Sequence, residues 1–313
     1  MFDVIGLGTV AMDVFLHVDE LPIEDGFASV LKTDYLPGGS GTNVLTQISR
    51  LSGKCGYMAQ ISDDLVGREI KQSMIDEKID INGLRIVQGA TTLHCDIVVD
   101  KKGRKFILLN LGNVFDKWTG NDIDLEYFTK AKIFYTDLLP AGPAIEGLKQ
   151  AKKNNMTTVF NLQMGMNTMK TLGASEQIIF DALEYVDIFA PCLGGFKQLC
   201  KTDDFEQAHN YIRNYFKKLL VCTLGDKGSI SFEENEDSVF IPAYPADVID
   251  TTGAGDSYLG AFIYSYLIDK KSLRESMKFA TSCAAYTCEH VGARMCPNLS
   301  QAQQTLERFE SKL

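Results

Sequence analysis

The sequence predicts an α/β protein in which a parallel sheet carries helices on both faces and a smaller sheet lies beside it. After Trp118, short apolar segments alternate with segments of helical periodicity, which is typical of a parallel sheet. Earlier in the chain, the segment 93–109 alternates on both sides of a glycine turn and predicts a β-hairpin. The weakly alternating segments 13–19 and 29–36 are expected to join this hairpin. We expect a single domain over 1–313, because no linker or internal repeat divides the chain.

The other expected elements follow from runs of apolar residues and the glycines that end them. A buried strand at 3–8 opens the chain, and a helix that ends at Gly53 follows a glycine-dense loop. The remaining strands are expected at 57–61, 133–136, 158–161, 188–190 and 219–223, with a second hairpin at 229–232 and 239–242. The remaining helices are expected at 65–77, 144–153, 175–185, 205–216, 254–268, 272–290 and 300–309.

The composition is that of a globular protein and excludes several classes of function. The 313 residues are 45% hydrophobic and carry a formal net charge of -10, which argues against a nucleic-acid partner. The N-terminus lacks the basic region of a signal peptide, and the apolar stretch 258–268 is too short to span a bilayer. We therefore expect a cytoplasmic protein with no membrane partner. The eight cysteines include no Cys-x-x-Cys pair and the four histidines no ligand-spaced pair, so we expect no zinc site.

The segment 250–256, Asp-Thr-Thr-Gly-Ala-Gly-Asp, carries the main functional signal. It turns through two glycines into a helical pattern, so the first amides of the helix would be unpaired and would form an anion site. A carboxylate at Asp256 would repel a phosphate, but it could take a proton while the amides hold developing negative charge. Phosphoryl transfer to a hydroxyl needs both a base that takes the proton and a site that stabilises the negative charge. The alternative is an ordinary turn, because aspartate is common in the first turn of a helix.

Two further segments contain glycines where a ligand could approach the backbone. The loop 37–43 offers amides at Gly38 and Gly39 and the side chain of Asn43, to which Asp13 would add an acceptor for hydroxyls. Its alternative is a plain loop in which Asn43 only starts a helix. The segment 221–229 is a strand, a glycine turn and a strand, where a nucleotide could lie against bare backbone. Its alternative is a connection with glycines at positive φ.

Together these segments resemble the ribokinase-like sugar kinases of the PfkB family. Asp-Thr-Thr-Gly-Ala-Gly-Asp-Ser at 250–257 matches the C-terminal signature of that family. The Gly38-Gly39-x-x-x-Asn43 loop matches its N-terminal signature, and Thr223-Leu-Gly225-x-x-Gly228 matches its nucleotide segment. The resemblance implies a ribokinase-like fold in which the small sheet, formed by 13–19, 29–36 and 93–109, is a lid. It also implies an enzyme that uses ATP and Mg²⁺ to phosphorylate a hydroxyl of a small sugar.

The resemblance also implies roles for individual residues. Asp256 would accept the proton of the attacked hydroxyl, although a helix N-terminus is expected to lower its pKa. The implied anion hole consists of the amides of Gly253, Ala254 and Gly255. The implied substrate contacts are Asp13, Gly38, Gly39 and Asn43. The implied nucleotide contacts are Asn161, Thr223, Gly225 and Gly228. A monovalent cation, K⁺, would lie near Asp250 and Thr252.

One departure from the family pattern leaves other functions open. The family usually has Asn-x-x-Glu, which supports Mg²⁺ and phosphate, where this chain has Cys-Leu-Gly-Gly at 192–195. Magnesium would then be held by nucleotide phosphates and water. One alternative is a nucleoside kinase of the same fold, and another is a catalytically silent sugar-binding or regulatory protein. An open lid sheet would leave strand edges exposed, so we also expect a homodimer through that sheet.

Overall fold

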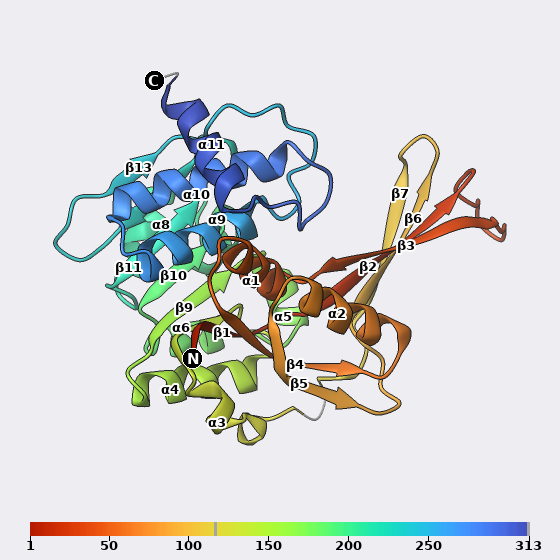
Figure 1. Ribbon diagram of the computed structural model, residues 1–313, viewed down its shortest axis with the longest axis horizontal. Coiled ribbons are helices and arrows are strands. Elements are labelled where there is room, and N and C mark those ends of the chain that lie inside the picture. Colours follow the sequence, from red (N-terminus) through yellow and green to blue (C-terminus); the bar gives the residue numbers. More distant parts are fainter. Residues whose placement is uncertain (116–117, 312–313) are drawn as a thin grey trace.

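The structure, a computed structural model, describes residues 1–115 and 118–311, so residues 116–117 and the last two residues of the predicted 1–313 domain lie outside the described residues. Its largest element is a nine-stranded sheet with the order β13-β12-β11-β10-β9-β8-β1-β4-β5 (Figure 1). The strands up to β11 pair in parallel, whereas β12 and β13 are antiparallel. Their bounds are β1 Phe2–Leu7, β4 Cys55–Ser62, β5 Asp80–Val87, β8 Ala131–Thr136, β9 Thr157–Leu162, β10 Ile188–Pro191, β11 Leu219–Thr223, β12 Ser229–Phe232 and β13 Val239–Ile241.

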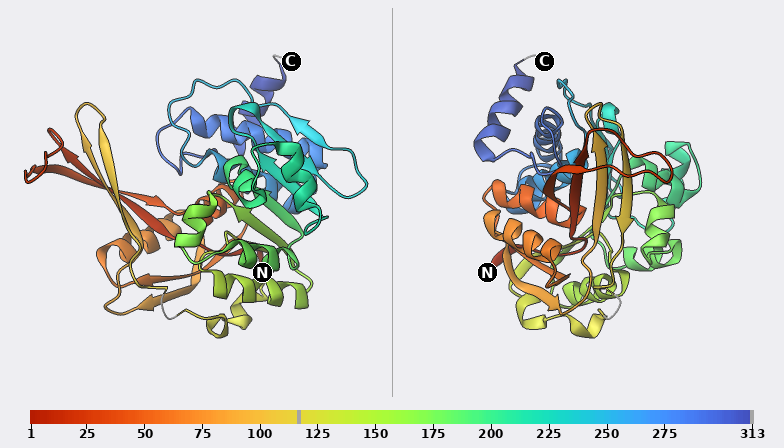
Figure 2. Two further views of the ribbon diagram at one scale, coloured as in Figure 1. Left: turned by 180° about the vertical axis from the view of Figure 1, so that it is seen from behind. Right: turned by 90° about the vertical axis from the view of Figure 1, so that its right-hand side faces the viewer.

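Helices cover both faces of this sheet, which confirms the predicted α/β class (Figure 2). One face is covered by α4 Ala141–Lys153, α6 Glu176–Leu183, α7 Leu193–Cys200 and α8 Phe205–Ile212. The other is covered by α1 Ser40–Arg50, α2 Leu65–Asp76, α9 Ala254–Ile263 and α10 Leu273–Cys288. Shorter or peripheral helices are α3 Leu125–Phe128, α5 Met166–Thr171 and α11 Leu299–Glu310.

Two hydrophobic cores follow from the two covered faces. Successive residues of a strand point to opposite faces, so Val159 of β9 packs in one core and Phe160 in the other. The central strands are apolar runs rather than alternating ones because neither of their faces is exposed to water. This is why the apolar runs in the sequence marked the central strands.

A second sheet of four strands projects from the body of the molecule (Figure 1). Its order is β3-β2-β6-β7, with bounds β2 Ala11–Val18, β3 Val30–Gly38, β6 His94–Asp100 and β7 Lys105–Asn110. These strands coincide with the predicted segments 13–19, 29–36 and 93–109. Strand β2 pairs in parallel with β6, and the other two pairs are antiparallel. Every residue of β7 is exposed.

The second sheet joins the body where two passages of the chain cross. The connection 8–10 leads from β1 into β2, and Gly39 leads from β3 into α1. Gly39 has φ 85°, and a Cβ there would lie 2.8 Å from the amide nitrogen of Ala11 and from the carbonyl oxygen of Thr9. Only glycine fits this position, because both the backbone angle and the space exclude a side chain.

The structure differs from the sequence prediction in several elements. The edge strand β5 was not predicted, because Asp80, Asn82 and Gly83 interrupt its apolar pattern. Helix α9 ends at Ile263 and continues as a π-helical turn over Tyr264–Ile268, and α10 ends at Cys288. The alternative interpretation of Asn43, as a residue that only starts a helix, is wrong, because α1 begins at Ser40 with Gly39 as its N-cap.

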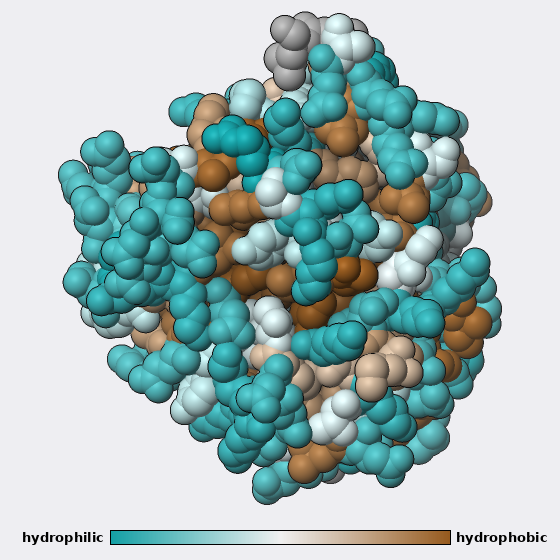
Figure 3. Space-filling model, turned by 60° about the vertical axis from the view of Figure 1, so that its left-hand side comes forward, coloured by the Kyte–Doolittle hydropathy of each residue, from teal (hydrophilic) through white to brown (hydrophobic). Residues whose placement is uncertain are grey.

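On the face shown in Figure 3, hydrophobic residues gather towards the centre and hydrophilic residues surround them. In the described part of the chain, none of the helices has the length and apolar character needed to cross a membrane.

Candidate active site

The N-terminus of α9 forms the tight turn that the sequence predicts. Gly253 has φ 78°, and a Cβ there would lie 2.1 Å from the carbonyl oxygen of Ala293, so only glycine fits. The amide of Ala254 donates to the carbonyl of Thr251 at 3.2 Å and is therefore engaged, unlike the prediction that all three amides are free. None of the hydrogen bonds among the described residues uses the amide of Gly253 or Gly255. Two unpaired amides thus remain beside the helix dipole, which favours an anion.

Asp256 lies in the first turn of α9 and accepts two side-chain hydrogen bonds from α1. Ser40 Oγ donates to Oδ1 at 2.5 Å, and Asn43 Nδ2 donates to Oδ2 at 2.9 Å. Burial raises the pKa of Asp256 to about 6, although these two bonds act in the opposite direction. The lowered pKa expected from the helix N-terminus is therefore not found, because loss of hydration is the largest influence on this carboxyl group. A carboxylate with a pKa near 6 is a stronger base than an ordinary aspartate and is still ionised at neutral pH.

Ser40 links Asp256 to residues of the large sheet, and sequence reasoning missed it. Its hydroxyl accepts a hydrogen bond from Asn161 Nδ2 at 3.2 Å, and Asn161 also donates to the hydroxyl of Tyr135 at 3.1 Å. The predicted nucleotide residue Asn161 therefore lies next to the predicted base rather than along the wall of the nucleotide cavity described below. The only sequence signal for Ser40 was its place at the glycine loop just before a helix.

Asp13 lies on β2, half-buried, on the side of the second sheet that meets the glycine loop. A Cβ on Gly38 would lie 3.5 Å from Asp13 Oδ2, so the loop and the carboxylate are in close contact. Burial raises the pKa of Asp13, while the thiol of Cys95 and the charge of Lys105 act in the opposite direction. Gly38, Gly39 and Asp13 thus gather at one place, as the sequence predicts, whereas Asn43 already donates to Asp256.

Asp137 is a second buried carboxyl group of the site, and sequence reasoning missed it. It follows β8 and accepts hydrogen bonds from the amide of Thr9 at 2.9 Å, the hydroxyl of Thr9 at 2.5 Å and the amide of Leu139 at 3.2 Å. Burial raises its pKa to about 6. Its charge also raises the pKa of Asp256. A lone aspartate 128 residues away from its partner Thr9 gives no local signal in a sequence.

A cavity of about 480 Å³ opens beside the N-terminus of α9. The predicted nucleotide residues Thr223, Gly225 and Gly228 line it together with Ala254 and Gly255 of the central turn. The rest of its wall is largely apolar and comes from the segment before the turn and from α10, including Tyr244, Val248, Ala284, Ala285 and Cys288. A mostly apolar cavity that ends at unpaired amides suits a flat base joined to phosphates.

Asp250 stabilises the turn that precedes α9. Its Oδ1 accepts hydrogen bonds from the amide and the hydroxyl of Thr252, at 3.0 and 2.7 Å, and its Oδ2 accepts from the amide of Gly292 at 2.9 Å. Burial opposes ionisation, but these bonds hold the pKa of Asp250 below its ordinary value. Because Oδ2 accepts a single bond, it retains a lone pair that a monovalent cation could use.

The segment that departs from the family pattern forms the start of α7. Cys192 is the N-cap of this helix, and its sulfur accepts a hydrogen bond from the amide of Gly195. The glutamate of the family pattern would stand at Gly195, where a Cβ would lie 2.6 Å from the carbonyl oxygen of Met164, so a side chain does not fit there unless the backbone shifts. Among the described residues, no group of three or more His, Cys, Asp or Glu side chains could hold a metal ion.

Comparisons with known proteins agree with this geometry. The chain is 26% identical over 311 residues to an ATP-dependent ribose-1-phosphate kinase of Halopiger xanaduensis, covering 99% of this chain and 100% of that protein. It is also 26% identical over 332 residues to a 5-dehydro-2-deoxygluconokinase of Geobacillus kaustophilus, covering 99% and 95% of the two chains. The fold is similar to that of Arabidopsis thaliana ribokinase complexed with ribose and ATP, with a TM-score of 0.85, 24% identity, and coverage of 98% and 99%.

The family model described as pfkB family carbohydrate kinase matches residues 1–299. The resemblance that the three motifs indicated is therefore confirmed, and the chain belongs to the pfkB family of carbohydrate kinases.

Proposed function

We propose that this carbohydrate kinase transfers the γ-phosphoryl group of ATP to a hydroxyl of a small sugar or sugar derivative, with Asp256 as the base. The observation that carries the proposal is the position of Asp256. Its carboxylate is held by Ser40 and Asn43 at the same helix N-terminus where the amides of Gly253 and Gly255 are unpaired. One group can accept the proton of the attacked hydroxyl while the others stabilise the charge on the transferred phosphoryl group.

The acceptor hydroxyl would approach between the two sheets. Asp13 on β2 and the backbone of Gly38 and Gly39 supply polar groups that suit the hydroxyls of a sugar, and Asn43 positions the base rather than acting as a free donor. As the hydroxyl attacks the γ-phosphorus, its proton passes to Asp256 and the bond from phosphorus to the bridging oxygen breaks, releasing ADP. The loose transition state lets the proton leave late, so a base with a pKa near 6 is sufficient.

ATP would lie in the cavity beside α9, with its base against the apolar wall and its phosphates towards Gly255. Mg²⁺ would be held by the phosphates and water, because the segment 192–195 offers no carboxylate and Mg²⁺ commonly keeps several waters. It would supply charge neutralisation at the phosphates. K⁺ would bind to the free lone pair of Asp250 near Thr252. Its positive charge would make the adjacent anion site more favourable for a phosphate.

The Asp256→Asn variant tests this proposal. It should lower kcat for phosphoryl transfer by about 10²- to 10⁴-fold, because the amide cannot accept the proton. Binding of ATP and of the acceptor should persist, as measured by calorimetry. The exposed Asp181 on α6 provides the matched control, and Asp181→Asn should leave kcat unchanged. A turnover rate of Asp256→Asn equal to that of the wild type would refute the assignment.

The substrate panel for the wild type should contain sugars, sugar phosphates and nucleosides, each with Mg²⁺ and K⁺. A ribose-1-phosphate kinase is among the relatives of this chain, so phosphorylated pentoses belong in the panel. If only nucleosides are phosphorylated, the enzyme is a nucleoside kinase of this fold. If ATP is not consumed with any acceptor although sugars bind, the protein is a silent sugar-binding member of the family. The missing carboxylate at 192–195 is the feature that favours this last outcome.

The enzyme would act as a homodimer through its second sheet. This sheet has two edge strands, β3 and β7, and exposes Leu36, Phe106, Ile107, Leu108 and Leu109. Unpaired strand edges beside exposed apolar side chains favour association with a second copy. The cytoplasm is the proposed location, since the eight free thiols suit a reducing compartment.

A further inference from the structure

We propose that Arg294 is a positioning residue, which holds Asn43 in the orientation that donates a hydrogen bond to Asp256 and so keeps this carboxylate ready to accept a proton. The inference rests on the proposed function of Asp256. It adds a residue from the segment between α10 and α11, which none of the three motifs of the sequence contains.

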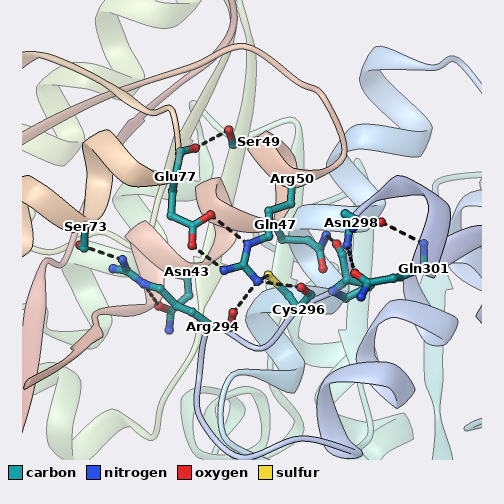
Figure 4. A network of polar contacts seen from close by, with 11 residues as sticks. Asn43, Gln47, Ser49, Arg50, Ser73, Glu77, Arg294, Cys296, Asn298 and Gln301 are labelled. Atoms are coloured by element: carbon teal, nitrogen blue, oxygen red, sulfur yellow. Dashed lines mark hydrogen bonds and ion pairs between the residues drawn. The ribbon is translucent and has the colours of Figure 1, made fainter. Parts of the chain in front are cut away.

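Arg294 is a buried arginine whose hydrogen-bond partners are all neutral. It is 9% exposed. Its Nε donates to Asn43 Oδ1 at 3.0 Å and its Nη1 to Ser73 Oγ at 3.0 Å (Figure 4). Its Nη2 donates to the carbonyl of Gly38 at 3.1 Å and to Thr42 Oγ1 at 2.8 Å. In the described part of the chain no carboxylate forms an ion pair with it. Burial lowers its pKa to about 10.

Such an arrangement is costly unless the charge has a use. A buried charge without an opposite partner loses hydration energy that neutral acceptors only partly replace. A methionine of similar length would fill the same space without that cost. The charge of Glu77, which forms its own ion pair with Arg50, also acts on Arg294. Along the hydrogen bonds of Arg294 itself, the acidic group that is reached is Asp256, one residue beyond Asn43.

The chemistry of the two side chains fixes the orientation of Asn43. A guanidinium group has only donors, so the carbonyl oxygen of Asn43 must face Arg294. The amide nitrogen of Asn43 must then face Asp256, to which it donates at 2.9 Å. If Asn43 were turned over, its oxygen would face the carboxylate and its nitrogen would face the guanidinium, and both contacts would be repulsive. Arg294 thereby excludes the orientation in which Asp256 loses a donor.

The charge of Arg294 also opposes the groups that favour protonation of Asp256. Burial and the carboxyl group of Asp137 raise the pKa of Asp256, whereas Ser40, Asn43 and the charge of Arg294 lower it. Two buried phenols, Tyr57 and Tyr135, also face it, and burial keeps both neutral by raising their pKa. Arg294 is one of three influences that lower the pKa of Asp256. Its removal should therefore raise this pKa.

Arg50 lies beside Arg294, and its substitution distinguishes a structural role of this region from a positioning role of Arg294. Arg50 forms an ion pair with Glu77 at 2.5 Å, and its Nη1 donates to the carbonyl oxygens of Arg294 at 2.6 Å and Cys296 at 2.8 Å (Figure 4). It therefore holds the same segment of chain in place. Within the described part of the chain, no hydrogen bond of Arg50 reaches Asn43 or Asp256. Arg50→Met is thus the matched control for Arg294→Met.

The test is the pH dependence of kcat between pH 5 and 9 for the wild type and both variants. In the wild type, kcat should fall below a pH of about 6, as Asp256 is protonated. In Arg294→Met this limb should move up by about one pH unit, and kcat should recover at higher pH. Arg50→Met should keep the wild-type limb, whatever it does to stability. An unchanged limb in Arg294→Met, or equal shifts in both variants, would overturn the inference.

Two additions keep the result decisive. Arg294→Lys keeps the charge and a donor and should restore the wild-type limb. If Arg294→Met does not fold, it is replaced by Arg294→Gln, which keeps a donor without the charge. If the wild type transfers no phosphoryl group, the proposed function fails, but the carboxyl carbon of Asp256 can still be titrated by NMR and assigned with Asp256→Asn. The pKa of Asp256 should then be lower in the wild type than in the Arg294 variant, and equal values would refute the positioning role by itself.

Discussion

At the scale of single residues, the site depends on carboxyl groups that burial makes more basic. Asp137 and Asp256 both have a pKa raised to about 6, and each accepts hydrogen bonds that stabilise its ionised form. Both oxygens of each group accept hydrogen bonds, but only Asp256 is adjacent to the unpaired amides, whereas Asp137 accepts from Thr9, Leu139 and Gln163. Two similar carboxyl groups thus have different uses: one serves the reaction and the other connects parts of the fold.

Asp137 should make the stability of the protein depend on pH in a definite direction. Its pKa in the fold is above that of an unfolded aspartate, so the native state binds the extra proton and is favoured at lower pH. That contribution is complete below the unfolded pKa and is lost as pH rises through about 6. The unfolding free energy of the wild type should therefore exceed that of Asp137→Asn by about 1 kcal/mol more at pH 5 than at pH 7.5.

Urea unfolding at the two pH values measures this difference. The exposed Asp181 on α6 provides the control, because Asp181→Asn makes the same substitution away from the buried site. If the gap between wild type and Asp137→Asn did not change with pH, Asp137 would not have the raised pKa that its surroundings imply.

At the scale of elements, the start of α9 requires its two glycines for different reasons. Gly253 needs a positive φ and has the carbonyl of Ala293 where a Cβ would be, whereas a Cβ on Gly255 would meet nothing within 4 Å. The first glycine therefore shapes the turn. The second lines the cavity and leaves room for a ligand.

Alanine at these two positions should have opposite effects on stability. Gly253→Ala should lower the unfolding free energy by more than about 2 kcal/mol, through backbone strain and a clash with Ala293. Gly255→Ala should leave it unchanged or raise it by about 0.5 kcal/mol, because alanine favours a helix. Gly255→Ala should nevertheless weaken ATP binding, because its methyl group enters the cavity. Thermal unfolding and calorimetry measure the two effects, and a Gly253→Ala variant as stable as the wild type would contradict this account of the turn.

Much of the fold could be predicted because its signals are local. Apolar runs marked the central strands, the glycine turn marked the hairpin of β6 and β7, and the segment 250–256 marked the start of α9. The edge strand β5 could not be predicted, since its polar residues face solvent and hide the pattern. The parts of the site that could not be predicted are those whose partners are far away in the chain.

Arg294 and Asn43 illustrate that limit, since 251 residues separate them. The pKa of Asp256 illustrates another: the local helix terminus predicts a lowered value, but burial by distant elements raises it. A motif can therefore identify the reactive residue while leaving its chemistry undetermined. Packing around the motif decides the sign of the shift.

At the scale of the whole molecule, two sheets of different character meet at the site. The large sheet is covered on both faces, whereas the second sheet extends away from the body, and every residue of its strand β7 is exposed. Its exposed apolar side chains are those expected of a surface that a second copy covers. The same sheet carries Asp13, so dimer formation and acceptor binding would involve one element.

Charges on both faces of β7 should prevent dimer formation. Ile107 and Leu108 are 53% and 57% exposed and point to opposite faces, so the double variant Ile107→Lys and Leu108→Lys introduces repulsion whichever face is covered. We expect a wild-type dimer and a monomeric variant in light scattering at micromolar concentration. The double variant Lys101→Ala and Lys102→Ala, in the turn between β6 and β7, is the control and should stay dimeric. A monomeric wild type would exclude this interface.

The crossing of the connection 8–10 with Gly39 has a geometric consequence for how the enzyme aligns its reactants. Asp13 is four residues from Thr9, and Ser40, which donates to Asp256, is the next residue after Gly39. The carboxylate that would bind the sugar and the hydroxyl that orients the base are therefore both attached close to this one crossing of the backbone. Hydrogen bonds from Thr9 to Asp137 fix the crossing to the interior. A displacement of this crossing would therefore move both groups together rather than one against the other.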